Sequence, residues 1–600
     1  MNRSRNRLAG GAIVLALVAG AALAQDRPES ILPPGFNETQ PPPPPADQPP
    51  PRAATPADRP QAGNLPPPPP VPQDELLGNM LADEEAGTPE PADPAALAAY
   101  ELPAYARRSL DTVGIIAPDE GGLPPGAFSA LPGRVIERLM GRLDAPIASR
   151  WMSIALRRAL ASQVATPAGV NGADFAAERA WLLLRMGEAQ VARAMVSAVD
   201  TDNYTPKMVE AAMQAALATG DPGLICPAVR AQPALSGDRA WVMMGAICGA
   251  LSGVAGEGPP QLAAARKRGV ARGIDLNLAE KLVGAGTRRA AVTIEWDSVD
   301  QLTAWRYGLA VAGGVDIPEA LFDTVSPRVR YWRAQAAGYP PLVRAAGAEQ
   351  AAAQGVLSSA ALIDLFGELD QADDAANPAV AAARTLRTAY ADPDRAARIA
   401  AMRDLWDGAS GNRQRYARLL LTSHAAAALV PARDQGGDAD QLIASMMAVG
   451  FDRAALRWRP VVARGSDGWA MLMLADRSGV PYGAGVARAY RGGSGDAARK
   501  RQMFFAGLAG LGLLSPASAS SLAGDLAVDI GLDNGWTRAI DRAAAANDAG
   551  TVVLLGAVGM QTTSWSGVSP AALYRIVAAM HRVGLDAEAR MIAIEALTRL

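Results

Sequence analysis

Histidine is nearly absent from this 600-residue chain, which contains only His424 and His581. A zinc site needs several nitrogen or sulfur ligands close together, and two histidines far apart in the sequence do not supply them. The chain also lacks a Gly-x-Ser-x-Gly elbow, a Walker-type phosphate loop and a dinucleotide-binding Gly-x-Gly-x-x-Gly fingerprint. The sequence therefore predicts no catalytic residues, no cofactor and no metal ion.

Blocks of basic residues and long apolar runs are missing as well. The net charge is -3, so the chain as a whole does not attract a polyanion, and nucleic acid is not an expected partner. Beyond residue 24, the best apolar stretches are Met503–Leu514 and Thr551–Met560. Both contain glycine and are shorter than the ~20 residues that a spanning helix needs. We therefore expect no transmembrane segment in the mature form.

The first 24 residues have the order of features of a secretory signal peptide. Arginines near the start precede an apolar run from Leu8 to Gly20, and Ala22-Leu23-Ala24 provides small residues for cleavage. We expect cleavage after Ala24 and, in a Gram-negative cell, a periplasmic mature protein.

Residues 25–97 are rich in proline and poor in large apolar side chains. Such a segment cannot bury enough apolar surface to offset its ordering entropy, so we expect a disordered, partly polyproline spacer. One apolar cluster interrupts it, and on a helix its members would share a face. The cluster is a turn of helix that packs on the folded domain or forms only transiently, or it is a docking motif for a partner. Its members are Leu76, Leu77, Met80 and Leu81.

From about residue 98 onward, helical periodicity dominates and alternating β patterns are nearly absent. Some helix starts can be recognised by their capping residues. Thr205-Pro206 and Ser569-Pro570 each place a hydroxyl at the N-cap and proline at the first helical position. Asp586 is expected to cap the last helix in the same way. The fold class that we predict is all-α.

Three glycines recur at a fixed interval of 33 residues, at positions 187, 220 and 253. Each follows an apolar helical run, as expected for a helix that ends at glycine and turns into the next. A repeat of this length is typical of stacked antiparallel helical hairpins, which bury a continuous core only when several units stack. We expect such an array in one or two lobes, with a boundary near residue 345 that separates 98–345 from 346–600.

The stretch Ala180-Trp181-Leu182-Leu183-Leu184-Arg185-Met186-Gly187, with Ala192 and the glycine spacing, resembles the tetratricopeptide and related α-solenoid families. The resemblance covers about a fifth of the chain, because units after Gly253 vary in length and most consensus aromatic and proline positions are missing. It implies an α-solenoid fold with a surface for protein or peptide partners. The chain also resembles uncharacterised exported helical proteins of α-proteobacteria with Pro-rich starts, and that similarity implies no activity.

Cys226 and Cys248 are the only cysteines. They lie at similar offsets on either side of the Pro233–Gly237 turn, so on antiparallel helices their sulfur atoms would be at similar heights. In an oxidising compartment this pair favours a structural disulfide over two buried thiols, and no Cys-x-x-Cys spacing suggests redox activity.

Acidic residues give the one hint of enzyme chemistry. Glu295, Asp297 and Asp300 surround Trp296 and have the residue types of a glycosidase carboxylate pair. Loop and cap carboxylates commonly look like this without any catalytic role, so solvated surface is the simpler interpretation.

The sequence favours a non-enzymatic periplasmic scaffold or adaptor that binds an envelope protein or peptide. The alternatives are an enzyme of unrecognised type that acts on cell-wall material and a purely structural envelope protein.

Overall fold

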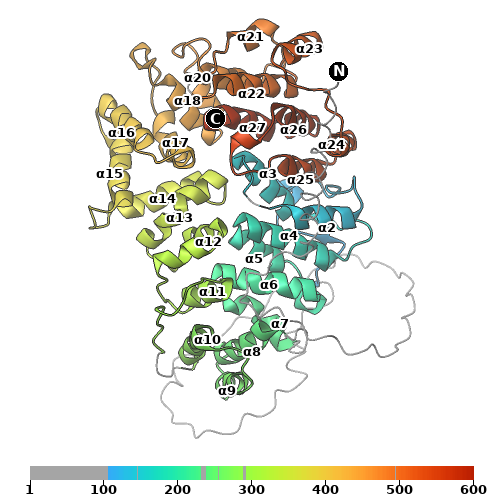
Figure 1. Ribbon diagram of the computed structural model, residues 1–600, viewed down its shortest axis with the longest axis vertical. Helices are drawn as coiled ribbons and strands as arrows, with labels where there is room; N and C mark the ends of the chain where they lie inside the picture. The colour runs from blue at the N-terminus through green and yellow to red at the C-terminus, as the bar shows by residue number, and fades with distance from the viewer. Residues whose placement is uncertain (1–105, 145, 232–237, 255, 288–291, 494) are drawn as a thin grey trace, which may run out of the picture. The chain divides into compact units, whose positions relative to one another are not determined.

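The computed structural model describes residues 106–600, apart from 145, 232–237, 255, 288–291 and 494. The predicted signal peptide, the Pro-rich segment and the cluster of Leu76, Leu77, Met80 and Leu81 lie outside the described residues. Residues 108–600 belong to one compact unit, whose regular elements in the described part are almost all helices (Figure 1), so the all-α prediction is confirmed. Within the described part, the one sheet pairs β1 (Thr112–Val113) with β2 (Val164–Ala165) in antiparallel register.

A first row of helices leads away from the middle of the unit, and from α3 to α9 most helices pack on the next one in the sequence (Figure 1). We call this the outgoing row. Its α-helices are α2 (Gly133–Arg142), α3 (Arg150–Ala161), α4 (Gly172–Met186), α5 (Ala189–Ser197), α6 (Pro206–Thr219), α7 (Cys226–Ala231), α8 (Arg239–Leu251) and α9 (Pro259–Lys267), with short 3-10 turns at η2 (Pro118–Glu120), η3 (Thr201–Asn203) and η4 (Pro222–Ile225).

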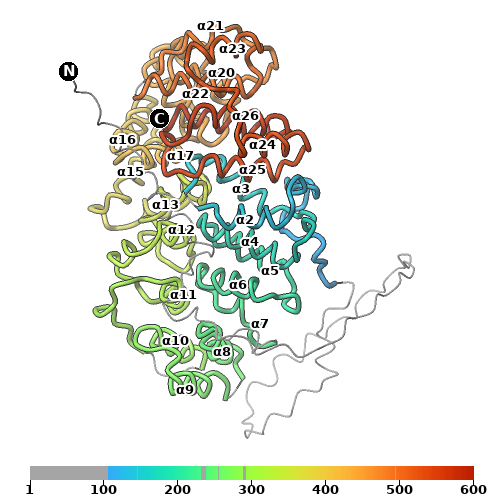
Figure 2. The backbone as a smooth tube through the Cα atoms, turned by 45° about the vertical axis from the view of Figure 1, so that its right-hand side comes forward, coloured from blue at the N-terminus to red at the C-terminus, as the bar shows by residue number. Residues whose placement is uncertain are grey.

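After α9 the chain doubles back and builds a second row on the first. In this returning row α10 packs on α8, α11 on α6, α12 on α4, α5 and α6, and α13 on α3. The two rows lie side by side in both views (Figures 1 and 2). The elements of the returning row are α10 (Gly273–Gly286), α11 (Ala304–Ala312), η5 (Glu319–Thr324), α12 (Pro327–Gln335), α13 (Pro341–Gln354) and α14 (Ser359–Asp370).

The remaining helices include α27, which packs on α3, α17, α18, α20, α22 and α26. Their bounds are α15 (Pro378–Ala391), α16 (Arg395–Asp407), α17 (Asn412–Ala427), η6 (Arg433–Gln435), α18 (Ala439–Ala448), α19 (Asp452–Leu456), α20 (Asp467–Leu474), α21 (Ala484–Ala489), α22 (Ala497–Gly510), α23 (Pro516–Asp525), α24 (Gly535–Ala545), α25 (Ala549–Gly559), η7 (Trp565–Gly567), α26 (Pro570–Arg582) and α27 (Asp586–Arg599).

The first long helices therefore meet the last ones. Helix α3 packs against α25 and α27, and α13 joins them by packing on both α3 and α17. The boundary predicted near residue 345 falls inside α13, which connects the returning row to the C-terminal helices through these contacts.

The predicted caps at Thr205 and Ser569 are confirmed. Each hydroxyl accepts a hydrogen bond from the backbone N–H three residues later, and proline occupies the next position in both helices. The prediction for Asp586 was wrong, because Leu585 is the N-cap and Asp586 is the first residue of α27. The Asp586 carboxylate bonds His581 Nδ1 at the end of α26 instead.

Two of the evenly spaced glycines lie where the rows meet. Gly187 ends α4 with φ +90° and Gly220 ends α6 with φ +63°. A Cβ atom on Gly187 would lie 2.7 Å from Cδ2 of Tyr331 in α12, and one on Gly220 would lie 2.5 Å from Cγ1 of Val311 in α11. These glycines thus end a helix and also leave room for the returning row. Gly253 has φ +73° as well, but nothing lies within 4 Å of its Cβ position.

This difference gives a matched test of the packing between the rows. Gly253→Ala should destabilise by about 1 kcal/mol, the cost of a left-handed residue with a Cβ. Gly220→Ala should destabilise by about 2 kcal/mol or more, because overpacking against Val311 adds to the same strain. Urea unfolding of the two variants measures the difference, and equal losses would contradict the close approach of α11 to the end of α6.

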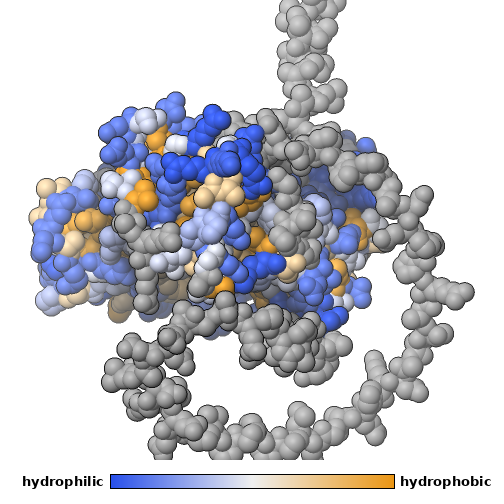
Figure 3. Space-filling model, turned by 90° about the horizontal axis from the view of Figure 1, so that it is seen from below, coloured by the Kyte–Doolittle hydropathy of each residue, from blue (hydrophilic) through white to orange (hydrophobic). Residues whose placement is uncertain are grey.

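No helix among the described residues is long and apolar enough to cross a membrane. Figure 3 views the unit from its α8–α10 end, where hydrophilic residues predominate and apolar residues are interspersed. Large apolar side chains that remain exposed in the described part are scattered along the chain. They are Leu251, Val254, Leu342, Val430, Val480 and Leu532.

Candidate functional site

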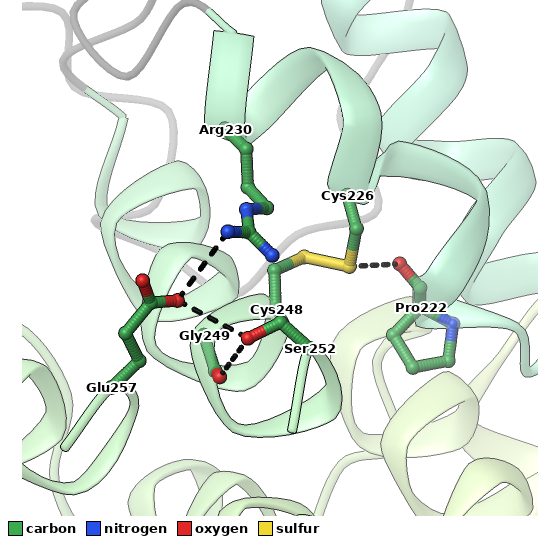
Figure 4. Close-up of a disulfide and its surroundings, with 7 residues drawn as sticks. All are labelled: Pro222, Cys226, Arg230, Cys248, Gly249, Ser252 and Glu257. Carbon is green, nitrogen blue, oxygen red and sulfur yellow. Dashed lines mark hydrogen bonds and ion pairs between the residues drawn. A yellow bond between two sulfur atoms is a disulfide. The ribbon is translucent and has the colours of Figure 1, made fainter. Parts of the chain in front are cut away.

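The predicted disulfide is present and links α7 to α8 (Figure 4). The Cα atoms of Cys226 and Cys248 are 5.3 Å apart, and Cys248 is fully buried. Beside it, Arg230 of α7 forms an ion pair of 3.7 Å with Glu257, whose carboxylate also accepts a hydrogen bond from the Ser252 hydroxyl. These contacts hold the short helix α7 against the end of α8, as expected of a structural bond. The Pro233–Gly237 turn that the prediction invoked lies outside the described residues.

Removing this disulfide should destabilise the outgoing row. A variant with both Cys226→Ser and Cys248→Ser is expected to lose about 3 kcal/mol, because a bond that closes a loop of this length restricts the unfolded chain. Chemical unfolding of the wild type with and without a reductant, beside the double variant, measures the loss. Equal stability of the reduced and oxidised protein would show that the bond contributes nothing.

The acidic residues that suggested an enzyme are exposed. Glu295, Asp297 and Asp300 lie on the loop between α10 and α11, and none of them lines a cavity described below.

The two histidines lie apart from each other. His424 packs edge-on against Phe451, whereas His581 pairs with Asp586. Within the described residues, no group of three or more His, Cys, Asp and Glu side chains is placed to hold a metal ion.

A cavity of about 290 Å³ opens between the loop that follows α11, η5, the end of α12 and the start of α13. We call it the Arg333 pocket. Its position follows from the turn where the chain leaves α12 and enters α13 at Pro340-Pro341, since proline disfavours a helical conformation at the residue before it. The lining residues are Asp316, Ile317, Glu319, Phe322, Arg333, Tyr339, Leu342, Val343 and Ala346.

Arg333 is the buried charge of this pocket, with 2% of its surface exposed. Its Nη1 and Nη2 atoms donate to the two carboxylate oxygens of Glu319 at 2.6 and 3.2 Å. The guanidinium carbon also lies 4.0 Å from the centre of the Phe322 ring, an arrangement that gains cation–π attraction. Glu319 itself is 67% exposed, so a cation at the floor of the pocket is neutralised by an anion at its mouth.

Aromatic rings surround this pair. Tyr307 of α11 contacts Phe322 and Trp332 with ring centres 6.5 and 5.8 Å apart. Burial raises the pKa of the Tyr339 phenol to about 12, and the negative charge of Asp316 acts in the same direction. Burial likewise raises the pKa of Tyr307, with the Tyr339 phenol as the second cause. Both phenols are therefore neutral at physiological pH and remain hydrogen-bond donors.

Several polar atoms around the pocket are buried without a hydrogen-bond partner in the described part of the chain. Arg333 Nε and Tyr339 Oη belong to residues that line the pocket, whereas Tyr307 Oη and Trp332 Nε1 belong to the adjoining aromatic cluster. Buried polar groups are nearly always satisfied in folded proteins, and each of these four carries a hydrogen to donate. A place where such donors gather beside an open cavity is suited to an acceptor that comes from outside.

A second cavity, of about 620 Å³, lies between β1 and the end of α5. Its lining consists mainly of small and polar side chains, with Arg108 at one side. Arg108 is exposed, and its backbone N–H donates to Asp200 at 2.8 Å. No buried, unpartnered polar side-chain atom of the described residues lines this cavity. The Arg333 pocket is therefore the stronger candidate site.

None of the Arg333 pocket residues was predicted from the sequence. They come from η5, α12, α13 and the loops that precede η5 and α13, where the helical repeat becomes irregular and gives no register for packing. The one available signal was the aromatic and charged run that includes Phe322, Tyr331, Trp332, Arg333 and Tyr339 within a chain of only 5% aromatic residues.

Comparison with models of known protein families, with curated proteins and with solved structures finds no match to this chain.

Proposed function

We propose that this chain is a non-enzymatic periplasmic scaffold or adaptor that binds an envelope protein or peptide through its helical surface. The observation that carries the proposal is the Arg333 pocket, because it combines an open cavity, a buried cation and unpartnered donors on one side of the returning row. Convergent polar groups in a mainly apolar cavity are typical of binding sites. The disulfide fits an exported protein, since such bonds persist in oxidising compartments.

The pocket favours binding over catalysis. General acid–base chemistry needs a titratable group near the operating pH within reach of a substrate. Here the buried phenols hold their protons far above neutral pH, and Glu319 is bound to Arg333. The runner-up, an enzyme acting on cell-wall material through Glu295 and Asp297, gains no support from their exposed position.

A crosslinking pull-down from intact cells tests the adaptor proposal. The tagged chain is expected to capture one or a few envelope proteins reproducibly, compared with an unrelated periplasmic protein. Deleting residues 25–97 separates the two candidate surfaces: capture that survives the deletion places the contact on the helical unit, whereas loss places it in the Pro-rich segment. Absence of enrichment over the control protein would contradict a stable adaptor.

A pair of variants connects this test to the pocket. Arg333→Leu should reduce the capture strongly, because it removes the buried cation and releases Glu319. Arg330→Leu is the matched control, since Arg330 lies on the same helix and pairs with Asp323 outside the pocket lining. Equal losses in both variants would mean that the pocket is not the contact.

A further inference from the structure

The mouth of the Arg333 pocket carries an acidic rim. Asp316 is exposed and forms no ion pair in the described part of the chain. The Glu319 carboxylate, also at the mouth, is held by Arg333 from below. Because Arg333 neutralises only one of these two carboxylates, the rim keeps a net negative charge that favours a cation.

Apart from these charged groups, the lining of the pocket is mainly apolar, and the cavity is small. Phe322 is buried in the wall, and Leu342, with 36% of its surface exposed, forms part of the opening. A cavity of about 290 Å³ lies at or below the roughly 300–1,000 Å³ of sites for drug-sized ligands. It therefore has room for one large apolar side chain rather than for a whole cofactor.

The Tyr339 hydroxyl is the third feature of the pocket that bears on its ligand, after the acidic rim and the apolar lining. Tyr339 is 7% exposed, lines the cavity, and its Oη atom has no hydrogen-bond partner in the described part. A neutral phenol donates readily to a carbonyl oxygen, and satisfying a buried donor is worth more than an ordinary exposed hydrogen bond. A peptide carbonyl that enters with the apolar side chain would satisfy it.

We infer that the Arg333 pocket binds a peptide segment in which a large apolar residue stands next to a basic one. The apolar side chain fills the cavity, its carbonyl oxygen accepts from Tyr339, and the neighbouring cation pairs with Asp316 and the exposed face of Glu319. This inference rests on the proposed adaptor function and specifies the chemistry of the partner. The binding is non-covalent.

Three synthetic peptides that differ at one position test the charge preference. The probes are acetyl-Gly-Leu-Lys-Gly-amide and the same peptide with Lys replaced by Gln or by Glu, each titrated to millimolar concentration against the full chain by ligand-observed NMR. The Lys peptide should bind about three- to fivefold more tightly than the Gln peptide, as expected for a partly exposed ion pair, and the Glu peptide most weakly. Equal binding of the Lys and Gln peptides, tighter binding of the Glu peptide, or no binding of any probe would overturn the inference.

Variants of the chain locate the contacts. Asp316→Asn should remove most of the difference in affinity between the Lys and Gln peptides, whereas Asp323→Asn, outside the lining, should leave that difference unchanged. Tyr339→Phe removes only an unpartnered hydroxyl, so folding should be unaffected while all probes bind about fivefold more weakly. An Asp316 or Tyr339 variant with wild-type affinity would overturn the assigned contact.

The peptide titrations and the pull-down together separate a wrong peptide chemistry from a wrong adaptor function. If no probe peptide binds but the pull-down loses its partner in Arg333→Leu, the apolar–basic chemistry is wrong and the adaptor function stands. If the pull-down also captures nothing, the adaptor function itself is contradicted.

Discussion

Replacing Glu595 with alanine is expected to lower the free energy of unfolding by about 3 to 5 kcal/mol, the usual loss when one partner of a buried ion pair is removed. Glu595 of α27 is 2% exposed and pairs with Arg599 at 2.7 Å. Its carboxylate also accepts from the backbone N–H groups of Arg150 and Trp151 at 2.8 and 3.2 Å. It therefore places a negative charge at the start of α3, where the helix dipole and free N–H groups favour an anion.

The loss is large because the surroundings depend on this carboxylate. Ser149, the N-cap of α3, donates its hydroxyl to Glu595 at 2.6 Å. Burial lowers the pKa of Arg150, and the Glu595 charge opposes that shift. Without Glu595, the Arg599 guanidinium would lose its carboxylate partner and keep hydrogen bonds to the carbonyl oxygens of Ala148 and Ala353.

Denaturant unfolding of the full chain, followed by circular dichroism, measures this effect. Glu595→Gln keeps the shape and removes the charge, so an intermediate loss is expected. Glu588→Ala is the control on the same helix: Glu588 and its partner Arg158 are 17% and 36% exposed, and the expected loss is about 1 kcal/mol or less. Similar losses for Glu588→Ala and Glu595→Ala would show that the contact between α3 and α27 is not held by this network.

Glu188 should make the protein less stable as the pH rises from about 4.5 to about 7. It follows Gly187, is 2% exposed, and accepts from Arg157 Nη1 at 2.8 Å. Burial raises its pKa to about 7, and the charge of Arg157 opposes this shift without cancelling it. The folded protein thus keeps the proton that the unfolded chain loses near its ordinary pKa, so this group's contribution to stability is complete at low pH and disappears through the folded pKa.

At 1.36 kcal/mol per pKa unit, the shift corresponds to roughly 3 to 4 kcal/mol across this pH range. Glu188→Gln imitates the protonated form and still accepts from Arg157, so its stability should lack this fall and exceed that of the wild type at pH 8. Unfolding free energies measured between pH 4 and 8 test this. Glu588→Gln leaves Glu188 in place and should keep the wild-type slope; a wild-type slope in Glu188→Gln would refute the assignment.

Local chemistry made part of this structure predictable. The hydroxyl–proline starts at Thr205 and Ser569 and the glycine ends at 187 and 220 depend on neighbours within one helical turn, so the sequence shows them directly. The disulfide was predictable because the chain has only two cysteines.

The remaining features depend on contacts between distant parts of the chain. Ser149 and Glu595 are separated by 446 residues, and nothing near either one indicates that the first and last long helices meet. The returning row was likewise hidden, because a repeat spacing shows how neighbouring units stack but not that Tyr331 packs on Gly187. The Arg333 pocket forms within that row, so the candidate site was missed together with the row that builds it.

Site-specific photocrosslinking in living cells tests the adaptor account most directly. A benzophenone amino acid at Leu342, on the opening of the pocket, should yield one dominant crosslinked envelope protein, and adding Asp316→Asn should weaken that band. The same group at Val430, which is 69% exposed and lies outside the pocket lining, should give no such product. Identical crosslinked products at both positions would contradict the adaptor function of the pocket. So would the absence of any crosslinked product at Leu342 while the protein is present and folded.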